Sequence, residues 1–367
     1  MKILQLTSHY YPNLGGVETH LQDLVKELTK KKHQVFVLTY RPLSTNSSWS
    51  IWENSSFLKV FRIPWFPGLF NKLSTYSALE FLYLVPGLFI ILPFILIFFK
   101  PRVIHSHGLV AGFVGAFWGK LFGIHTVIST HSIYHFPKSG LYRAVSKHIF
   151  LMTNQTLCLS NQSVSEIVSL GIPANHVHRF TYWVDLDKFK PMSKSIAKKK
   201  LKWKSKFCVL FVGRLVKEKG IMILDEAASA LKKHDILVYV AGSGPEFRNI
   251  KNCILLGSVS QEKLPIYYNA ADLLIVPSIH EEGFGRVILE SLACGTPVVA
   301  ANRGAIPEAM DNTVGKLIDI TPKNIAKTIN DLYQHTQLLA KLAKKSHSFA
   351  TRFYSPANII EITSSYE

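Results

Sequence analysis

The sequence predicts an α/β protein built from two doubly wound parallel sheets that face each other across a cleft. Short apolar segments alternate with longer helix-like segments from end to end, which is typical of parallel sheets covered by helices. The alternation pauses at a lysine-rich stretch after Asp187 and then restarts. The 367 residues also exceed what one hydrophobic core usually holds. We therefore expect two domains, with ligands at the carboxyl ends of the strands.

The first domain is expected over residues 1–186, where six apolar segments have the length and composition of strands. These predicted strands are Ile3–Thr7, Val35–Tyr40, Val60–Ile63, Val103–Ser106, Thr126–Thr130 and Thr156–Leu159. Helices are expected to begin near Val17, Gly112, Gly140 and Gln162.

The second domain is expected over residues 187–345, and a C-terminal helix over residues 346–367 is expected to cross back to the first domain. The predicted strands of this domain are Phe207–Val212, Ile236–Ala241, Cys253–Leu256, Leu273–Val276 and Pro297–Ala300, with a helix beginning at Gly220.

An uncharged apolar run, Phe81 to Phe99, is about long enough to cross a bilayer, although two prolines interrupt it. Three arrangements compete: a transmembrane span, an ordinary buried helix, and a helix lying against the membrane surface. We favour the third, because Lys72 precedes the run and Lys100 and Arg102 close it. The membrane-associating segment is accordingly placed at residues 65–99.

The formal charge of +18 indicates an anionic partner. Two lysine clusters, at residues 30–32 and 194–206, are interpreted as a solvated helix end and a solvated linker. Nucleic-acid binding would require aromatic side chains among the charges, and the second cluster contains a single one, Trp203. We therefore expect a phosphorylated substrate and an anionic membrane surface as partners, and no nucleic acid.

No metal or other cofactor is expected. The four cysteines are widely spaced and form no C-x-x-C pair, so they are interpreted as reduced thiols of a cytosolic protein. The histidines between His105 and His135 form no i, i+4 pair and have no carboxylate nearby in the sequence. The N-terminus becomes polar too early for a signal peptide.

The loop from Gly213 to Gly220 carries the first candidate site. A predicted strand ends there and a helix begins, and Arg214 and Lys219 stand five residues apart. Free backbone N–H groups at a helix start, together with two cations, suit a diphosphate group.

The segment from Glu282 to Glu290 carries the second candidate site. Gly283 and Gly285 allow a close approach of the backbone to a ligand, and the helix that opens there offers free amides to phosphate or sugar oxygens. We expect Glu282 and Glu290 to lie about two turns apart on nearly the same helix face, as a pair of acids that grips a sugar.

These motifs resemble glycosyltransferase family 4, whose members have the GT-B fold of two Rossmann-like domains. The matching segments are E-G-F-G-x-V-x-L-E with A-C-G-T-P-V-V-A, the loop G-R-L-x-x-E-K-G, the turn A-G-S-G-P-E at Ala241–Glu246, and Gly15-Gly16-Val17-Glu18. The resemblance covers essentially the whole chain. It implies a retaining enzyme that moves a hexose-type sugar from a nucleotide-diphosphate sugar, which serves as co-substrate.

The same resemblance implies roles for individual residues. Arg214 and Lys219 would neutralise the diphosphate, and Glu290 would hold the ribose hydroxyls. The implied catalytic residues are His131, Glu282, Arg214 and Lys219. The implied donor-binding residues are Gly16, Arg214, Lys219, Gly242, Gly244, Glu282, Gly283, Phe284, Gly285 and Glu290. On the acceptor side the implied residues are His107, His131 and Tyr134.

The hinge region departs from the family pattern. Asp185-Leu186-Asp187 looks like the D-x-D motif of metal-dependent transferases, but it matches instead the family's interdomain N-G-V-D-x-x-x-F. Tyr182-Trp183 stands where the family has Asn-Gly, which affects the hinge and the nearby acceptor contacts.

An apolar, basic-flanked first domain favours a lipid or lipid-linked acceptor at the cytoplasmic face of the membrane, with the enzyme peripherally or monotopically attached. Three alternatives remain. A dinucleotide-dependent oxidoreductase lacks support, because the first strand-to-helix turn has no G-x-G-x-x-G. A sugar-nucleotide epimerase would share the domain type, and a catalytically inactive sugar-nucleotide-binding membrane protein would share the motifs.

Overall fold

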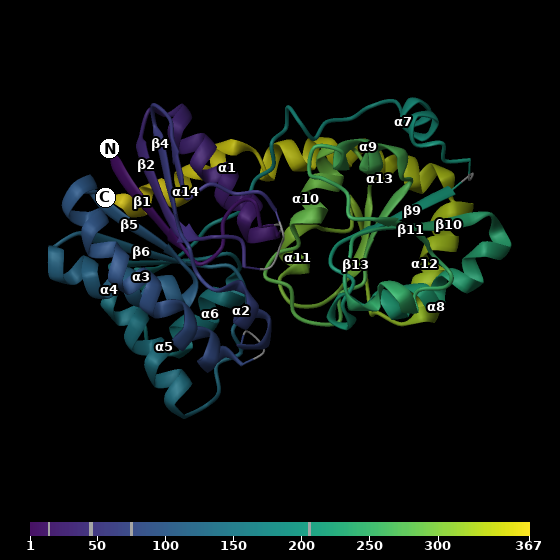
Figure 1. Ribbon diagram of the computed structural model, residues 1–367. Helices are drawn as coiled ribbons and strands as arrows, with labels where there is room; N and C mark the ends of the chain where they lie inside the picture. The colour runs from purple at the N-terminus through teal and green to yellow at the C-terminus, as the bar shows by residue number, and fades with distance from the viewer. Residues whose placement is uncertain (14, 44–46, 74–75, 205–206) are drawn as a thin grey trace. The chain divides into compact units, whose positions relative to one another are not determined.

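The computed structural model describes residues 1–13, 15–43, 47–73, 76–204 and 207–367, which form two compact α/β units (Figure 1). Unit 1 contains Met1–Thr181 together with Asn358–Glu367, and unit 2 contains Tyr182–Ala357. Residue 14 of the predicted first turn, residues 74–75 of the predicted membrane-associating segment and Lys206 of the second lysine cluster lie outside the described residues.

Unit 1 is built on an eight-stranded sheet in the order β3-β4-β2-β1-β5-β6-β7-β8. Its strands are parallel except β3, which runs antiparallel to β4. The six strands predicted for this half are confirmed, whereas β3 and β8 were not predicted because three residues are too few to show a period. The strands are β1 (Lys2–Thr7), β2 (Gln34–Tyr40), β3 (Trp52–Asn54), β4 (Leu58–Ile63), β5 (Val103–His107), β6 (His125–Thr130), β7 (Gln155–Cys158) and β8 (Val177–Arg179).

The helices of unit 1 follow the strands closely. A helix start was predicted near Gly112, but helix α4 begins at Gly108. Gly108 adopts a positive φ of 82° and turns the chain directly out of β5. The helices are α1 (Gly16–Lys30), α2 (Pro67–Leu73), α3 (Ser77–Phe99), α4 (Gly108–Phe122), α5 (Leu141–Met152), α6 (Asn161–Ser169) and α14 (Ile359–Thr363), with 3-10 turns at Ala174–His176 and Ser364–Tyr366.

Helix α3 contains the apolar run and packs along one face only. Its leucines at four-residue spacing, Leu84, Leu88, Leu92 and Leu96, are buried in the core of unit 1. The hydroxyl group of Tyr40, from β2, donates to the carbonyl of Leu84 and accepts from the N–H of Leu88, so it bridges the helical hydrogen-bond pair.

The opposite face of α3 is exposed. Leu82, Ile90 and Phe98 are 68%, 60% and 81% exposed. Within the described ranges, α3 is the one helix long and apolar enough to cross a bilayer, and 28% of that stretch is buried. The helix is therefore neither an ordinary buried helix nor detached from unit 1.

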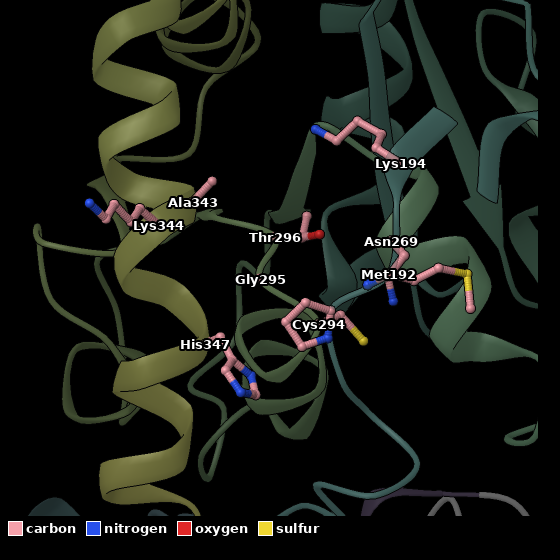
Figure 2. A pocket seen from close by; sticks show the side chains of 10 residues that line it. Met192, Lys194, Asn269, Cys294, Gly295, Thr296, Ala343, Lys344 and His347 are labelled. Atoms are coloured by element: carbon pink, nitrogen blue, oxygen red, sulfur yellow. Dashed lines mark hydrogen bonds between the residues drawn. The ribbon is translucent and has the colours of Figure 1, made fainter. Parts of the chain in front are cut away.

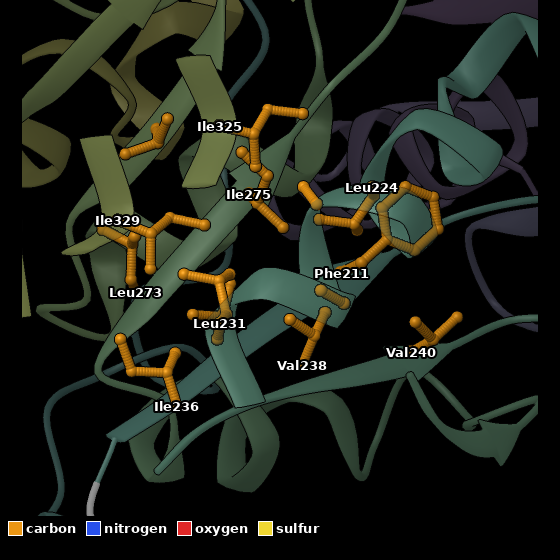
Figure 3. Packing of buried hydrophobic residues seen from close by; sticks show 14 of the residues in the cluster. Phe211, Leu224, Leu231, Ile236, Val238, Val240, Leu273, Ile275, Ile325 and Ile329 are labelled. Atoms are coloured by element: carbon orange, nitrogen blue, oxygen red, sulfur yellow. The ribbon is translucent and has the colours of Figure 1, made fainter. Parts of the chain in front are cut away.

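Unit 2 is built on a six-stranded parallel sheet in the order β11-β10-β9-β12-β13-β14. Apolar side chains from one face of β9 and β10 pack with those of helices α8 and α12 in its core (Figure 3). The strands are β9 (Phe207–Val212), β10 (Ile236–Ala241), β11 (Ile254–Gly257), β12 (Leu273–Val276), β13 (Val298–Ala301) and β14 (Gly315–Ile318). The last of these was not predicted, because Gly315 and Lys316 interrupt its short apolar pattern.

The helices of unit 2 are α7 (Lys194–Leu201), α8 (Ile221–Leu231), α9 (Leu264–Ala270), α10 (Arg286–Ala293), α11 (Ile306–Ala309), α12 (Pro322–Gln334) and α13 (Thr336–Phe353), with 3-10 turns at Lys217–Lys219, Lys232–His234, Pro245–Asn249 and Pro356–Asn358.

The second lysine cluster forms helix α7 rather than a linker, and most of its described lysines are solvent-exposed as predicted, but two of them pair with an acid. Lys194 Nζ and Lys198 Nζ lie 2.7 and 2.8 Å from the two carboxylate oxygens of Asp272. The ring of Trp203 is buried and stacks on Tyr239 with the centroids 3.8 Å apart. Both partners are distant in the sequence, and a local charge pattern does not reveal them.

Each sheet changes direction of winding at one place, between β1 and β5 in unit 1 and between β9 and β12 in unit 2. At such a switch point the loops after two neighbouring strands diverge and leave a crevice at the carboxyl edge, where ligands bind in open α/β sheets. Gly16, Arg214 and Glu282 lie after β1, β9 and β12, and His107 ends β5, while His131 follows the neighbouring strand β6.

Candidate active site

Two histidines meet at the carboxyl edge of the first sheet. His107 ends β5 and His131 directly follows β6, and these strands are hydrogen-bonded neighbours. Their rings stack at 24° with centroids 5.2 Å apart, and His107 Nδ1 lies 3.0 Å from His131 Nε2. The structure therefore brings these two predicted residues into one hydrogen-bonded pair.

The histidine pair is electrically neutral near pH 7. Burial lowers the pKa of His131 to about 3, and burial followed by repulsion from His105, His131 and His20 lowers the pKa of His107 well below its usual value. A neutral imidazole is a poor general base at such a pKa but a good partner for a sugar hydroxyl, since it has one donor and one acceptor nitrogen.

Gly16 is the first residue of α1, at the β1 side of the same switch point. A Cβ atom built on Gly16 meets no atom within 4 Å, so nothing in the described protein requires glycine there. Among the described residues no side chain caps the N-terminus of this helix, and the acid Glu18 lies in its first turn.

Tyr134 lies in a different environment from the two histidines. Its ring packs against Phe136 at 5.3 Å in the cluster around α6. The loop is held by Glu166, which accepts hydrogen bonds from the N–H groups of Tyr134 and Phe136 at 2.9 and 3.1 Å. Tyr134 thus forms part of the wall of this loop, and its role toward an acceptor stays a prediction.

In unit 2, the loop after β9 is joined to the loop after β12 by an ion pair. Lys219 Nζ lies 2.5 Å from Glu282 Oε1, and Ser278 donates to the same oxygen at 2.5 Å. Burial alone would raise the pKa of Glu282, but the charge of Lys219 and these two hydrogen bonds outweigh it and lower the pKa. Oε2 of Glu282 takes no hydrogen bond from the part of the chain that is described.

Close backbone contacts hold the Arg214 loop in place. A Cβ atom on Gly220 would lie 1.8 Å from the carbonyl oxygen of Pro277, and one on Gly242 would lie 1.9 Å from that of Gly213. A Cβ atom on Gly244 would lie 2.4 Å from the carbonyl oxygen of Leu215. The glycines of the A-G-S-G-P-E turn therefore support the Arg214 loop, which is a structural reason for them beside the predicted donor contact.

The Arg214 side chain is solvent-exposed, and across the described residues no acid forms an ion pair with it. The guanidinium group is planar and always charged, with several N–H donors suited to phosphate oxygens. Arg214 and the Lys219–Glu282 pair thus place two cations at the switch point of unit 2.

The expected arrangement of Glu282 and Glu290 on one helix face was wrong. Helix α10 begins at Arg286, after Gly285 adopts the left-handed conformation with φ 84°, so Glu282 belongs to the preceding loop. Glu290 is 2% exposed and accepts from Tyr268 Oη at 2.8 Å and Gln261 Nε2 at 2.8 Å. A ribose hydroxyl would have to share or displace these partners.

The glycine turn before α10 shapes the second half of this site. Gly285 is required because of its positive φ, and no side chain in the described part of the chain caps the helix N-terminus. Phe284 is buried and packs edge-on against Tyr182 and Tyr354 at 6.0 and 5.8 Å. Tyr182, which departs from the family pattern, thus fixes the loop of Phe284, leaving the backbone of Gly283 and Phe284 as the ligand-facing groups.

Several residues that contact the predicted site were missed from the sequence. Gln5 interrupts the apolar pattern of β1, and Ser278 stands only four residues before its partner Glu282, so these two signals were available in the sequence. The others gave no signal because their partners are far away in the chain. The missed residues are Gln5, Gln261, Tyr268, Ser278 and Tyr366.

The pocket in Figure 2 is a separate feature of unit 2. It has a volume of about 310 Å³ and lies at the C-terminal end of α10, opposite the glycine turn, where Cys294 and His347 line it. The four cysteines are free thiols. Among the described residues, no three His, Cys, Asp or Glu side chains are grouped as a metal site, and a metal-free reaction stays a prediction.

Two family models match the chain. The model of Glycosyltransferase Family 4 matches residues 14–188, and that of Glycosyl transferases group 1 matches residues 193–349. The phosphatidylinositol N-acetylglucosaminyltransferase GPI3 subunit of Saccharomyces cerevisiae is 26% identical over 351 residues, which covers 91% of this chain and 74% of the yeast protein.

Solved structures share the fold over the whole length. Sucrose-phosphate synthase from Thermosynechococcus elongatus superposes with a TM-score of 0.82 at 20% identity, covering 100% of this chain and 98% of the synthase. HepE of Anabaena, in complex with UDP-glucose, superposes with a TM-score of 0.76 at 20% identity, covering 99% and 98%. The chain belongs to glycosyltransferase family 4 and is a glycosyltransferase with the GT-B fold.

Proposed function

We propose that this enzyme transfers a hexose-type sugar from a nucleotide-diphosphate sugar to a hydroxyl of a lipid-type acceptor at the cytoplasmic face of a membrane. The observation that carries the proposal is the anion site of unit 2, where exposed Arg214 and the Lys219–Glu282 pair accompany the uncapped start of α10. Two cations and a helix N-terminus match the charge of a diphosphate.

In the proposed reaction the acceptor hydroxyl attacks from the face that the diphosphate leaves, so the anomeric configuration is retained. Negative charge grows on the leaving diphosphate, and Arg214, Lys219 and the first amides of α10 stabilise it without rearrangement. The diphosphate oxygen takes the proton of the acceptor. His131, neutral as described, bonds a hydroxyl of the sugar, and Oε2 of Glu282 accepts another.

The ion pair of Lys219 has a consequence for donor binding. In the ligand-free structure the ammonium group neutralises Glu282, and a bound diphosphate would compete for the same charge. The three N–H donors of a lysine can serve Glu282 and a phosphate oxygen together. With the donor bound, the ammonium group of Lys219 and the guanidinium group of Arg214 would face three negative charges, one on Glu282 and two on the diphosphate, and the helix N-terminus of α10 would offset part of the difference.

The support for a lipid-type acceptor is the exposed apolar face of α3. Beside the C-terminal end of this helix lies a cavity of about 550 Å³, which Trp52, Phe57 and Phe98 line together with Lys2 and Lys59. Aromatic rings next to lysines suit the boundary between lipid tails and anionic head groups. The name of the yeast relative, which includes phosphatidylinositol, points in the same direction.

The donor can be tested by thermal shift with UDP-, GDP- and ADP-sugars, because a ligand that binds the native state raises the melting temperature. UDP-N-acetylglucosamine is the first candidate, given the yeast relative's name and the UDP-glucose complex of HepE. Incubation with phosphatidylinositol vesicles should then give a glycosylated lipid with retained configuration, identified by mass spectrometry and NMR. Donor binding without any transfer would favour the inactive binding protein instead.

The assigned residues are tested in the same assay. Lys219→Ala and Glu290→Ala should abolish transfer, whereas Lys323→Ala, which removes an exposed lysine of α12 in the same unit, should keep it. Full turnover by Lys219→Ala would contradict the donor site proposed here.

A further inference from the structure

A buried chain of hydrogen bonds joins the C-terminal segment to the histidine pair. The hydroxyl of Tyr366 lies 3.3 Å from Gln5 Nε2 and 2.7 Å from His105 Nδ1. At its other end, Gln5 places Oε1 2.7 Å from His107 Nε2, and His107 contacts His131 as described. Gln5 is fully buried and Tyr366 is 1% exposed, so water does not compete for these bonds.

The orientation of Gln5 determines which ring nitrogens carry protons. An amide oxygen only accepts, so His107 Nε2 must be the N–H nitrogen and Nδ1 of the neutral ring must hold the lone pair. That lone pair accepts from His131, so His131 carries its proton on Nε2 and has a lone pair on Nδ1. The tautomers of the two rings are thus linked.

Tyr366 determines the orientation of Gln5. Its oxygen accepts from the Gln5 amide nitrogen, and its own proton goes to His105 Nδ1. His105 then donates through Nε2 to Ser129 Oγ at 2.6 Å, which completes one consistent set of donors and acceptors. Without the hydroxyl, the amide is free to rotate by half a turn and to present N–H to His107. Both histidine tautomers would then reverse.

We propose that Tyr366 is a positioning residue that fixes the tautomers of His107 and His131 through Gln5. The inference rests on the proposed function of His131 as a hydrogen-bond partner of the sugar. With the tautomer of the structure, His131 Nδ1 accepts from a sugar hydroxyl, and with the reversed tautomer it would have to donate there. A residue of the segment that follows unit 2 thereby determines which nitrogens donate and which accept in a site whose other members are residues 5, 107 and 131.

The direct test is Tyr366→Phe, which removes one hydroxyl and keeps the ring. Ring nitrogen NMR of the ligand-free enzyme, with the His131 signals assigned by their loss in His131→Asn, should show a proton on Nε2 in the wild type. Tyr366→Phe should show a mixture of tautomers or the reversed one. An unchanged tautomer in Tyr366→Phe overturns the inference, whatever the activity.

The matched control is Tyr40→Phe, which removes another buried hydroxyl of unit 1 that bonds to α3 and not to the histidines. Tyr366→Phe is expected to lower kcat by about tenfold to hundredfold with a change of less than about twofold in the donor KM, because the sugar is misoriented rather than unbound. Tyr40→Phe should alter the melting temperature by a similar amount and leave kcat unchanged.

The two proposals fail in different ways. If His131→Asn keeps full turnover, the proposed role of His131 is wrong. If His131→Asn is inactive while Tyr366→Phe turns over like Tyr40→Phe, the positioning role of Tyr366 is wrong. Should Tyr366→Phe not fold, Gln5→Met breaks the same connection with a side chain of similar length, and the same tautomer change is expected.

Discussion

Replacing Lys219 by methionine would separate the structural and the chemical roles of the anion site. The lysine side chain is 27% exposed and that of Glu282 is 12% exposed, so the substitution leaves a largely buried carboxylate with Ser278 as its remaining bonded partner. Breaking one partner of a buried pair costs about 3–5 kcal/mol, and the partial exposure of Lys219 reduces this through solvent screening to about 2–3 kcal/mol.

For a domain of this size, that loss lowers the melting temperature by roughly 5–10 °C. The pKa of Glu282 should rise in Lys219→Met, because burial then acts without the opposing charge. In the wild type the pKa of Glu282 is lower in the folded than in the unfolded chain. The stabilisation is therefore complete above the unfolded pKa and is lost as the pH falls through the folded pKa.

The measurements are urea unfolding followed by circular dichroism, together with donor binding and turnover. The double variant Lys219→Met/Glu282→Gln removes both charges and should regain most of the stability, yet it should remain inactive because the cation for the diphosphate is missing. Recovery of turnover in the double variant, or wild-type turnover in Lys219→Met, would refute the reasoning.

Three further outcomes are expected. Gly220→Ala should lower the free energy of unfolding by at least about 2 kcal/mol, because its Cβ would lie 1.8 Å from a carbonyl oxygen. Gly16→Ala, whose Cβ has open space around it, should fold normally and lose donor affinity. Normal donor binding by Gly16→Ala would argue against a ligand at α1. Phe98→Ser removes a ring that is 81% exposed, and burying that ring at a lipid interface is worth about 1.5 kcal/mol. The variant should therefore bind phosphatidylinositol vesicles about tenfold more weakly in sedimentation assays. The control Phe353→Ser, in unit 2, should bind the vesicles like the wild type, and equal losses in the two variants would contradict a role for α3. Burial lowers the pKa of His131 to about 3, so unfolding exposes a group that gains a proton below pH 6.5. As the pH drops from 6.5 toward 4, His131 should contribute up to about 1.4 kcal/mol per pH unit to the fall in the free energy of unfolding, in addition to the contributions of other buried histidines such as His107. His131→Asn should reduce the slope by this share, and an unaltered slope would speak against a buried neutral ring.

The donor loops were predictable from the sequence because their determinants are local. Gly285 needs a positive φ, Gly220 needs the room of a missing side chain, and Arg214 and Lys219 stand within a few residues of Gly220. The sequence did not reveal where α10 begins. The spacing of Glu282 and Glu290 had suggested that one helix carries both acids, but Gly285, at φ 84°, separates Glu282 from α10.

Contacts between distant segments were beyond sequence reasoning. Asp272 holds the lysines of α7, and Tyr366 meets His105 across 261 positions of sequence. The hydroxyl of Tyr40 bonds to the backbone of Leu84 and Leu88 in α3, and no apolar pattern in the sequence predicts this contact. Buried polar partners such as these depend on the tertiary structure, while the apolar strands and glycine turns follow from the local chain.

The return of residues 358–367 to unit 1 makes that unit discontinuous, which has a consequence for synthesis on the ribosome. Domains generally fold in the order in which they emerge, N-terminal first. The sheet of unit 1 can assemble while unit 2 is still being made, but Gln5 and His105 must wait for Tyr366. A nascent chain that has completed both sheets but not residues 358–367 therefore still holds its histidines in an unfinished hydrogen-bond network.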